Sequence, residues 1–232
     1  MSTGLWAIVP AAGVGARMHA DRPKQYLPLA GKTVIEVTLD RLAAVPGISG
    51  IFVGIGENDR WWPEIAPRAT DAFRGGAERA LTVLNGLHTV SRFAHPDDLV
   101  LVHDAVRPCV RVSDIVRLIE RGGTCADGGL LALPVADTVK QAASDNRVVA
   151  TVPRDRLWRA LTPQLFKVRT LADALESAVA AGNPVTDEAS AIERAGGHPM
   201  LVEGAADNIK ITVSADLVLA ELILRAQSVE NG

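Results

Sequence analysis

The sequence contains few of the residues that build metal centres, disulfide frameworks or serine-hydrolase sites. Its only cysteines are Cys109 and Cys125, and its five histidines show no metal-ligand spacing. No Gly-x-Ser-x-Gly elbow is present, because Ile51 follows the run Gly47-Ile48-Ser49-Gly50. Two cysteines without paired spacing also favour a reducing compartment. We therefore disfavour zinc and serine-hydrolase chemistry and expect a cytoplasmic protein.

The chain also lacks an excess of charge of either sign and a long apolar run. Its 24 basic and 27 acidic residues leave a formal net charge of −3, so no global field favours nucleic acid or an anionic membrane. The N-terminus has no basic region of a signal peptide, and the most apolar late segment, residues 216–226, is interrupted by Glu221. We expect neither nucleic acid nor a membrane as a partner, so any anion must be bound locally.

Short apolar runs alternate with helical patterns along the 232 residues, of which 48% are hydrophobic. Strand-like runs lie at residues 5–9, 50–55, 99–103, 130–134 and 200–203. Apolar residues at helical spacing lie at residues 33–45, 77–90, 112–121, 170–181 and 215–226. This alternation is typical of a mostly parallel sheet covered by helices on both faces.

Residues 137–152 interrupt the rhythm. Residues 138–141 and 147–152 alternate like strands about a Ser144-Asp145-Asn146 turn, which predicts a β-hairpin projecting from the sheet. A hairpin without a core of its own is marginal in water and often packs on a second subunit. We therefore expect this arm to serve dimerisation.

The first strand leads into a basic loop that contains two glycines, and this loop fits neither common nucleotide fingerprint. Met18 stands where a dinucleotide-binding loop needs its third glycine, and Tyr26 stands where a Walker A loop needs its first. Thr33, inside the Walker-like Gly31-Lys32-Thr33, is better interpreted as a helix N-cap.

The same loop can nevertheless bind phosphate. The run Ala11-Ala12-Gly13-Val14-Gly15 allows backbone amides to cup phosphate oxygens, and Arg17 and Lys24 add positive charge. An ordinary strand-to-loop turn with solvated basic residues is the alternative interpretation.

Two further segments fall where a doubly wound sheet binds its ligands, at the carboxyl ends of strands. Gly75-Gly76-Ala77-Glu78-Arg79 precedes a helix that carries Thr82, and its alternative role is a helix-capping loop. Asp104 and Arg107 follow a buried strand, where charge is unusual unless it is used; a surface ion pair is the alternative. His103 is interpreted as a strand-end histidine that makes local hydrogen bonds.

Near the C-terminus, Thr186-Asp187-Glu188 and Asp207-Asn208-Ile209-Lys210 repeat this pattern of polar clusters. Thr186 is equally compatible with a plain helix N-cap. For Asp207 and Lys210 in the second cluster, a structural salt bridge is the competing interpretation.

Together these segments resemble one family. They read PAAGVGARM…RPKQYLPLAGKTVIE, GGAERALTVLNGL, VHDAVRPCV, LPVADTVK, RLWRALTPQLF, TDEASAIE and LVEGAADNIKIT. In this order they are similar to the 2-C-methyl-D-erythritol 4-phosphate cytidylyltransferases, the CTP-using enzymes of the non-mevalonate isoprenoid pathway. Single pieces are shared with ribitol-5-phosphate cytidylyltransferases. The resemblance implies one Rossmann-like domain over residues 1–232, a homodimer joined through the arm, and a divalent cation, usually Mg²⁺.

The resemblance also assigns roles to individual positions. It implies a nucleotide site for CTP formed by Pro10, Ala11, Ala12, Gly13, Gly15, Gly75, Gly76, Ala77, Thr82, Asp104 and Ala105. Within this site it implies that Asp104 and Ala105 contact the ribose. For the 2-C-methyl-D-erythritol 4-phosphate acceptor it implies contacts from Arg107, Thr138, Thr162, Thr186 and Lys210, with Arg154 supplied by the partner subunit. Two departures are visible, since many members have aspartate at Ala77 and serine at Thr82.

The catalytic assignment implied by the resemblance is Arg17, Lys24, Asp207 and Lys210, with Asp207 and Asp104 as uncertain metal candidates. A phosphate oxygen of the acceptor must attack the α-phosphorus of CTP although both are anions, so positioned cations should carry the catalysis. Transfer to ribitol 5-phosphate and a nucleotide-binding regulatory module without catalysis remain alternatives. A glycosyltransferase is disfavoured because the sequence has no Asp-x-Asp motif.

Overall fold

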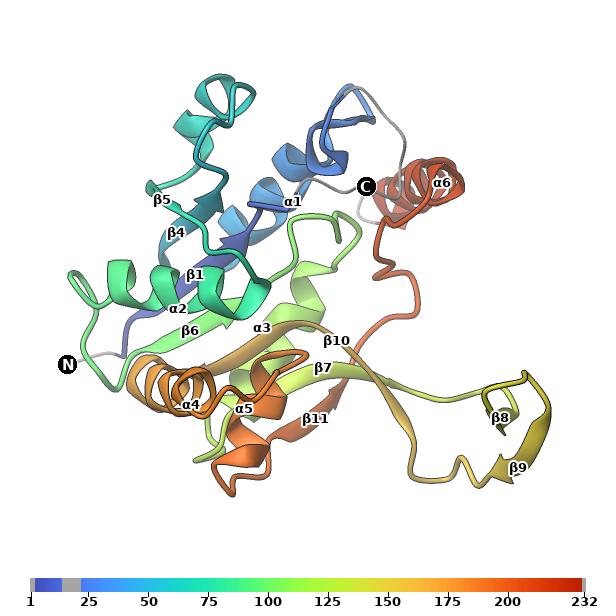
Figure 1. The fold of residues 1–232 in the computed structure, drawn as a ribbon. Coiled ribbons are helices and arrows are strands. Elements are labelled where there is room, and N and C mark those ends of the chain that lie inside the picture. The colour runs from blue at the N-terminus through green and yellow to red at the C-terminus, as the bar shows by residue number, and fades with distance from the viewer. Residues whose placement is uncertain (1–2, 14–21, 231–232) are drawn as a thin grey trace.

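A seven-stranded sheet forms the centre of the computed structural model, which describes residues 3–13 and 22–230 (Figure 1). The strand order is β11-β7-β10-β6-β1-β4-β5. The strands are β1 (Leu5–Pro10), β4 (Ile48–Ile55), β5 (Asp71–Arg74), β6 (Leu99–Val102), β7 (Gly129–Pro134), β10 (Trp158–Lys167) and β11 (Met200–Glu203). Only β10 runs antiparallel to its neighbours in this sheet. The predicted mostly parallel sheet is confirmed.

Helices cover both faces of the sheet. They are α1 (Val34–Ala43), α2 (Arg79–Val90), α3 (Val112–Gly122), α4 (Val168–Ala180), α5 (Glu188–Arg194) and α6 (Ser214–Glu230). Side chains alternate along β1, so Ala7 and Val9 pack in one core cluster with residues of α1 and α3, while Ile8 packs in another with residues of α2, α4 and α5. The expected cover on both faces is therefore confirmed.

Short elements connect β1 to α1. They are the 3-10 helix η2 (Lys24–Tyr26) and the strands β2 (Pro28–Leu29) and β3 (Lys32–Thr33), which pair in a tight hairpin. Ala30 and Gly31 have positive φ angles of 51° and 79° at its turn, so the Walker-like run belongs to a hairpin and not to a phosphate loop. Thr33 caps α1 in a capping box with Glu36, as predicted.

The arm is a separate two-stranded antiparallel sheet of β8 (Val139–Ala142) and β9 (Val148–Val152). It extends away from the body beyond the ends of β7 and β10 (Figure 1). Val148 and Val149 are 63% and 64% exposed in the single chain. These apolar side chains have no core to enter within the chain that the structure describes.

Among the strands of the central sheet and the α-helices, three elements were not predicted from the sequence, namely β5, β10 and α5. β5 has four residues and α5 has seven, which is too short for a clear period. β10 contains Pro163, a residue that argues against an interior strand, and the structure accommodates it where the register with β7 shifts between Ala160 and Gln164.

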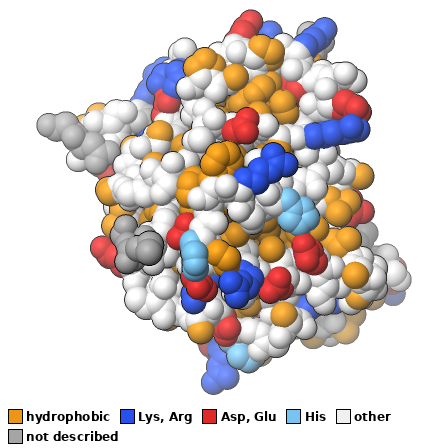
Figure 2. Space-filling model, turned by 90° about the vertical axis from the view of Figure 1, so that its left-hand side faces the viewer, with side chains coloured by type: hydrophobic (Ala, Val, Ile, Leu, Met, Phe, Trp, Pro, Cys, Tyr) orange, Lys and Arg blue, Asp and Glu red, His pale blue; other side chains and the backbone are white. Residues whose placement is uncertain are grey.

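The remaining described helices are the 3-10 turns η3 (Trp62–Glu64) and η4 (Ala66–Arg68) between β4 and β5. None of the helices within residues 3–13 and 22–230 is long and apolar enough to cross a bilayer. On the face shown in Figure 2, basic and acidic side chains are interspersed, so this face presents no field of a single sign.

Candidate functional site

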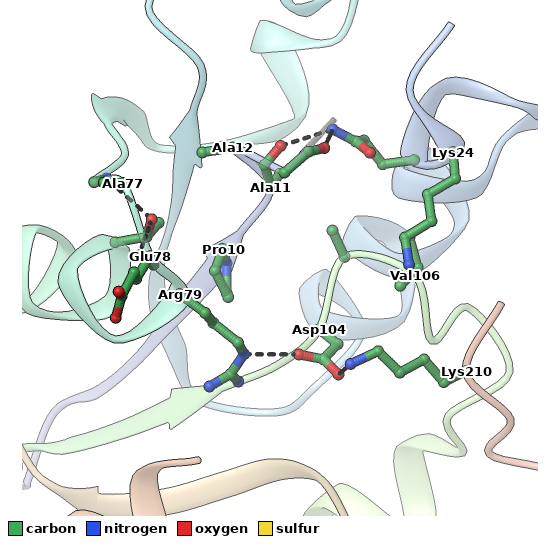
Figure 3. Close-up of a pocket in the computed structure, with 15 residues that line it drawn as sticks. Pro10, Ala11, Ala12, Lys24, Ala77, Glu78, Arg79, Asp104, Val106 and Lys210 are labelled. Atoms are coloured by element: carbon green, nitrogen blue, oxygen red, sulfur yellow. Dashed lines mark hydrogen bonds and ion pairs between the residues drawn. The ribbon is translucent and has the colours of Figure 1, made fainter. Parts of the chain in front are cut away.

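A cavity of about 220 Å³ opens at the carboxyl ends of the central strands (Figure 3). The end of β1, the loop before α2, the end of β6 and the segment before α6 contribute to it. Its lining residues are Pro10, Ala11, Ala12, Gly13, Lys24, Gln25, Gly76, Ala77, Glu78, Arg79, Thr82, Asp104, Ala105, Val106 and Lys210. The structure thus brings together most of the predicted nucleotide-binding positions, with Lys24 and Lys210. Gly15 and Arg17 lie outside the described residues.

The loop after β1 is held by Gln25, a residue that the sequence analysis missed. The Gln25 amide donates hydrogen bonds to the carbonyl oxygens of Ala11 (2.7 Å) and Gly13 (3.1 Å), and the side chain is 3% exposed. The backbone N–H of Ala11 donates to the carbonyl of Gly54 on β4. These bonds fix the first residues of the loop before any ligand binds.

Gly75 does not line the cavity but brings two of its walls together. A Cβ atom at Gly75 would lie 2.3 Å from the Cβ of Ala12, so only glycine permits the loop before α2 to approach the loop after β1 this closely. Thr82 holds the next residues in place. Its buried hydroxyl accepts from the N–H of Gly76 (3.0 Å) and donates to the carbonyl of Glu78 (3.1 Å).

Asp104 is a buried carboxylate at the centre of a cluster of charges. Its carboxylate is 3.2 Å from Arg79 Nε and 2.9 Å from Lys210 Nζ (Figure 3). It also lies 3.5 Å from Arg107 Nε. Burial alone would raise the pKa of Asp104, but the three cations hold that pKa well below its usual range. The alternative of a surface ion pair is wrong, because the Asp104 side chain is only 9% exposed.

Glu188 adds a second, buried carboxylate to this cluster. Its two carboxylate oxygens accept from Arg79 Nη1 (2.5 Å) and Nη2 (3.1 Å), and the residue is 1% exposed. Burial raises the pKa of Glu188, while Arg79 opposes that rise. The sequence analysis gave neither residue a role, although each belongs to a polar cluster that it singled out.

His103 and Thr162 support the backbone of Asp104. His103 Nε2 lies 3.1 Å from the carbonyl of Arg107 and must donate to it, so Nδ1 accepts from the Thr162 hydroxyl at 3.0 Å. The same hydroxyl accepts from the N–H of Asp104. The prediction of local hydrogen bonds for His103 is confirmed. Because the buried Thr162 hydroxyl already bonds two protein groups, its substrate contact stays a prediction.

A second hollow of about 280 Å³ adjoins the first, and Lys210 lines both. Arg107 and Arg159 also line it, and sequence analysis had assigned no role to Arg159. Arg107 Nη1 donates to the carbonyl of Asn208 (2.8 Å). Three basic side chains therefore surround a space next to the first cavity, which suits an anionic second substrate.

Asp207 and Lys210 each make a salt bridge, but with different partners. The Asp207 carboxylate pairs with Arg111 (2.6 Å) and accepts from Gln227 (3.0 Å), whereas Lys210 pairs with Asp104. The competing interpretation of a structural salt bridge therefore fits both residues. Asp207 lines neither of the two cavities within the described residues, so its catalytic role stays a prediction.

The remaining predicted acceptor residues lie at the periphery. Thr186 is exposed, and the N-cap of α5 is Asp187, so the N-cap interpretation of Thr186 is wrong. Thr138 and Arg154 lie at the base of the arm, where Arg154 Nη1 donates to the carbonyl of Ala136. In the single chain these three residues line neither cavity among the parts that the structure describes.

The doubly wound sheet carries a small-residue loop, two lysines and a buried aspartate at its carboxyl edge. These features define a nucleotide-binding α/β protein, and the adjoining hollow leaves room for an anionic second substrate.

Comparison with known proteins identifies the family within this class. The sequence pattern of the IspD family, 2-C-methyl-D-erythritol 4-phosphate cytidylyltransferase, matches residues 5–226. Curated proteins with this name include that of Hahella chejuensis, 52% identical over 95% of this chain and 93% of the relative. A second is that of Vibrio vulnificus, 50% identical over 96% and 95%. The chain therefore belongs to the 2-C-methyl-D-erythritol 4-phosphate cytidylyltransferase family.

Solved structures agree with this assignment. A crystal structure of 4-diphosphocytidyl-2C-methyl-D-erythritol synthase superposes with a TM-score of 0.84 at 37% identity, covering 97% of this chain and 99% of the other. The 2-C-methyl-D-erythritol 4-phosphate cytidylyltransferase of Francisella tularensis superposes with a TM-score of 0.78 at 36% identity, covering 95% and 100%. The family resemblance and the Rossmann-like fold predicted from the sequence are both confirmed.

Proposed function

We propose that this chain transfers the cytidylyl group of CTP to 2-C-methyl-D-erythritol 4-phosphate, forming 4-diphosphocytidyl-2-C-methyl-D-erythritol and pyrophosphate in isoprenoid precursor biosynthesis. Membership of the family supports this function. The observation that carries it is the pair of adjoining hollows bridged by Lys210, one shaped by the small-residue loop and the other bordered by Arg107 and Arg159. Two anionic substrates can meet there beside a shared cation.

The reaction needs no covalent intermediate on the protein. An acceptor phosphate oxygen forms a bond to the α-phosphorus of CTP while the bond to the β-phosphate oxygen breaks, and the electron pair leaves with pyrophosphate. Because both reactants are anions, the protein must supply positive charge to the transition state. Lys24 and Lys210 line the cavity and are assigned this role, together with Arg17 from outside the described residues.

We assign Mg²⁺ to the triphosphate of CTP as part of the substrate, where it offsets negative charge. Magnesium is commonly held by one or two carboxylates together with substrate phosphates. Asp104 is a carboxylate in the cavity wall but is already surrounded by three cations. The described residues contain no cluster of three metal-ligating side chains, which is consistent with a metal that enters on the nucleotide. Asp207 and Asp104 remain the candidate protein contacts of the metal, and we assign to Asp104 a contact with the ribose of CTP, as the family resemblance implies.

We infer that the protein is a homodimer joined through the arm, acting in the cytoplasm. The exposed Val148 and Val149 favour a covered arm, because large apolar side chains gain free energy by leaving water. In this arrangement Arg154, and Thr138 beside it, would reach the acceptor site of the partner subunit. Both cysteines are free, which suits a reducing compartment.

The acceptor specificity tests the proposed function. The purified protein is given CTP and Mg²⁺ with either 2-C-methyl-D-erythritol 4-phosphate or ribitol 5-phosphate, and pyrophosphate release is followed. We expect rapid release with the first acceptor and little with the second. Faster release with ribitol 5-phosphate would assign the chain to that related activity. Binding of CTP without any release would indicate a regulatory module.

A further inference from the structure

We propose that Glu188 is a positioning residue which, through Arg79, orients the Asp104 carboxylate toward the ribose hydroxyls of the nucleotide and thereby sets the preference for CTP over its deoxy analogues. The inference rests on the proposed function, in which Asp104 contacts the ribose. It adds an ion pair, the buried Glu188 with the partly buried Arg79, that supports the residue in contact with substrate.

Three elements distant in sequence meet at this pair. Arg79 begins α2, Asp104 follows β6, and Glu188 begins α5. The guanidinium places two nitrogens on Glu188, at 2.5 and 3.1 Å, and its Nε on Asp104 at 3.2 Å. Because a guanidinium is planar and rigid, a bidentate partner on one edge determines where the remaining N–H points. Glu188 therefore fixes the direction of the bond to Asp104.

Glu188 is itself anchored independently of Arg79. Asp187 caps α5, and the Gln164 side chain on β10 donates to Asp187 (2.9 Å) and accepts from the N–H of Ala189 (2.8 Å). The Asp187 carboxylate and the Ala189 backbone, on either side of Glu188, are thus tied to the central sheet. The Glu188 carboxylate is therefore a fixed reference against which Arg79 is aligned.

The charges explain why a second carboxylate is needed. Arg79, Arg107 and Lys210 surround Asp104. Without Glu188, three cations would compete for one carboxylate, and Arg79 would be drawn toward the triphosphate. With Glu188 in place, the Arg79 guanidinium stays bound to protein carboxylates and does not turn to the nucleotide. Lys210 approaches Asp104 from the side opposite to Arg79 (Figure 3). Asp104 is then held between two cations with its orientation defined.

Nucleotide discrimination separates this role from simple structural support. The Glu188→Gln variant keeps the size of the side chain and one acceptor oxygen but loses the charge. We expect its kcat/KM for CTP to fall about tenfold or more, the scale of one hydrogen bond to a charged group. One of the analogues 2′-deoxy-CTP and 3′-deoxy-CTP lacks the hydroxyl that Asp104 contacts. The kcat/KM of the variant for that analogue should change little. The ratio between CTP and that analogue therefore falls.

A matched control is Glu36→Gln, which weakens another Arg–Glu pair, Arg68 with Glu36, away from the cavity. It should leave the ratio unchanged. An equal loss for CTP and both deoxy analogues in Glu188→Gln would overturn the proposal. So would a wild-type enzyme that uses all three nucleotides equally, whereas absence of wild-type activity with CTP would instead refute the proposed function.

A double-mutant cycle tests whether Glu188 acts through Asp104. In an Asp104→Asn background, Glu188→Gln should cause little further loss of kcat/KM for CTP, because the residue being positioned has lost its charge. Additive losses would contradict the proposal. If Glu188→Gln does not fold, the paired change Arg79→Met with Glu188→Met removes both buried charges together and should show the same reduced discrimination.

Discussion

At the scale of single residues, the site is organised by cations placed around anions. Lys24 lies at the start of η2 and lines the same cavity as Asp104, and its ammonium donates to the carbonyl of Ile211 at 3.3 Å. This contact ties the loop after β1 to the segment before α6. Lys24 is thus held at the cavity wall where a reacting phosphate would lie.

We predict that Lys24→Ala lowers kcat about a hundredfold or more, the usual effect of removing one donor to a transition-state oxyanion. The KM for CTP should change much less, because the backbone loops and Asp104 still bind the nucleotide. Steady-state kinetics provide the measurement, with Lys32→Ala as the control, since Lys32 pairs with Asp40 and does not line the cavity. A near-normal kcat with only a raised KM would contradict the assignment.

His103 gives a prediction for stability against pH. Burial lowers its pKa to about 4 from an ordinary 6.5. Between these values the unfolded chain binds a proton that the folded chain does not, so stability is full above about pH 6.5 and falls as the pH is lowered toward 4. Over this pH range His103 lowers the free energy of unfolding by about 3 kcal/mol. Urea unfolding at several pH values should show a shallower fall in His103→Gln than in the wild type, and parallel curves would refute this explanation.

At this scale the sequence revealed charged residues in positions that are usually apolar. It did not reveal ion pairs and hydrogen bonds between residues far apart in the sequence. A charged Asp104 after a buried strand is visible in the sequence. The ion pair of Arg79 with Glu188 joins residues 109 positions apart, and Gln25 appears as an ordinary polar residue. Neither partnership has a local signal, because each depends on how the loops meet at the edge of the sheet.

At the scale of elements, the cavity depends on how closely two loops approach. Gly75 allows the loop before α2 to lie against Ala12 after β1. The periodicity of the sequence was sufficient to locate the strands and longer helices that carry these loops. It was insufficient for β10, because Pro163 argues against a strand at this position, and for α5, which is too short to show a period.

We predict that Gly75→Ala raises the KM for CTP about tenfold or more, because the new methyl would lie 2.3 Å from the Cβ of Ala12 and force the loops apart. Gly56→Ala is the matched control: its added Cβ would meet only the carbonyl oxygen of Ala12, at an ordinary 3.9 Å. Enzyme kinetics with varied CTP provide the measurement. Equal KM values in the two variants would show that the close approach is not needed.

At the scale of the whole molecule, the arm is the part that the single chain leaves without a packing partner among the described residues. β8 and β9 form their own small sheet, and Val148 and Val149 on β9 are exposed. The sequence predicted this hairpin because alternation and a turn interrupt the α/β rhythm. Dimerisation through the arm, with Arg154 reaching the partner subunit, remains a proposal.

Subunit complementation tests that proposal. Arg154→Ala protein and Lys24→Ala protein, each inactive alone, are mixed under conditions of subunit exchange confirmed by native mass spectrometry. If Arg154 acts across the dimer, one of the two sites in each heterodimer contains both residues. Activity should then return to about half of the wild-type value per heterodimer. Heterodimers that form but stay inactive would show that Arg154 serves its own chain.

The central claim, that the α-phosphorus of CTP is attacked and pyrophosphate leaves, is tested most directly by tracing the phosphates. The enzyme is incubated with 2-C-methyl-D-erythritol 4-phosphate and CTP labelled with ³²P at either the α or the γ position, and the products are separated. We predict that the α label appears in the diphosphocytidyl product and the γ label in pyrophosphate. Transfer of the γ label to the acceptor, or release of the α label as CMP, would contradict the account.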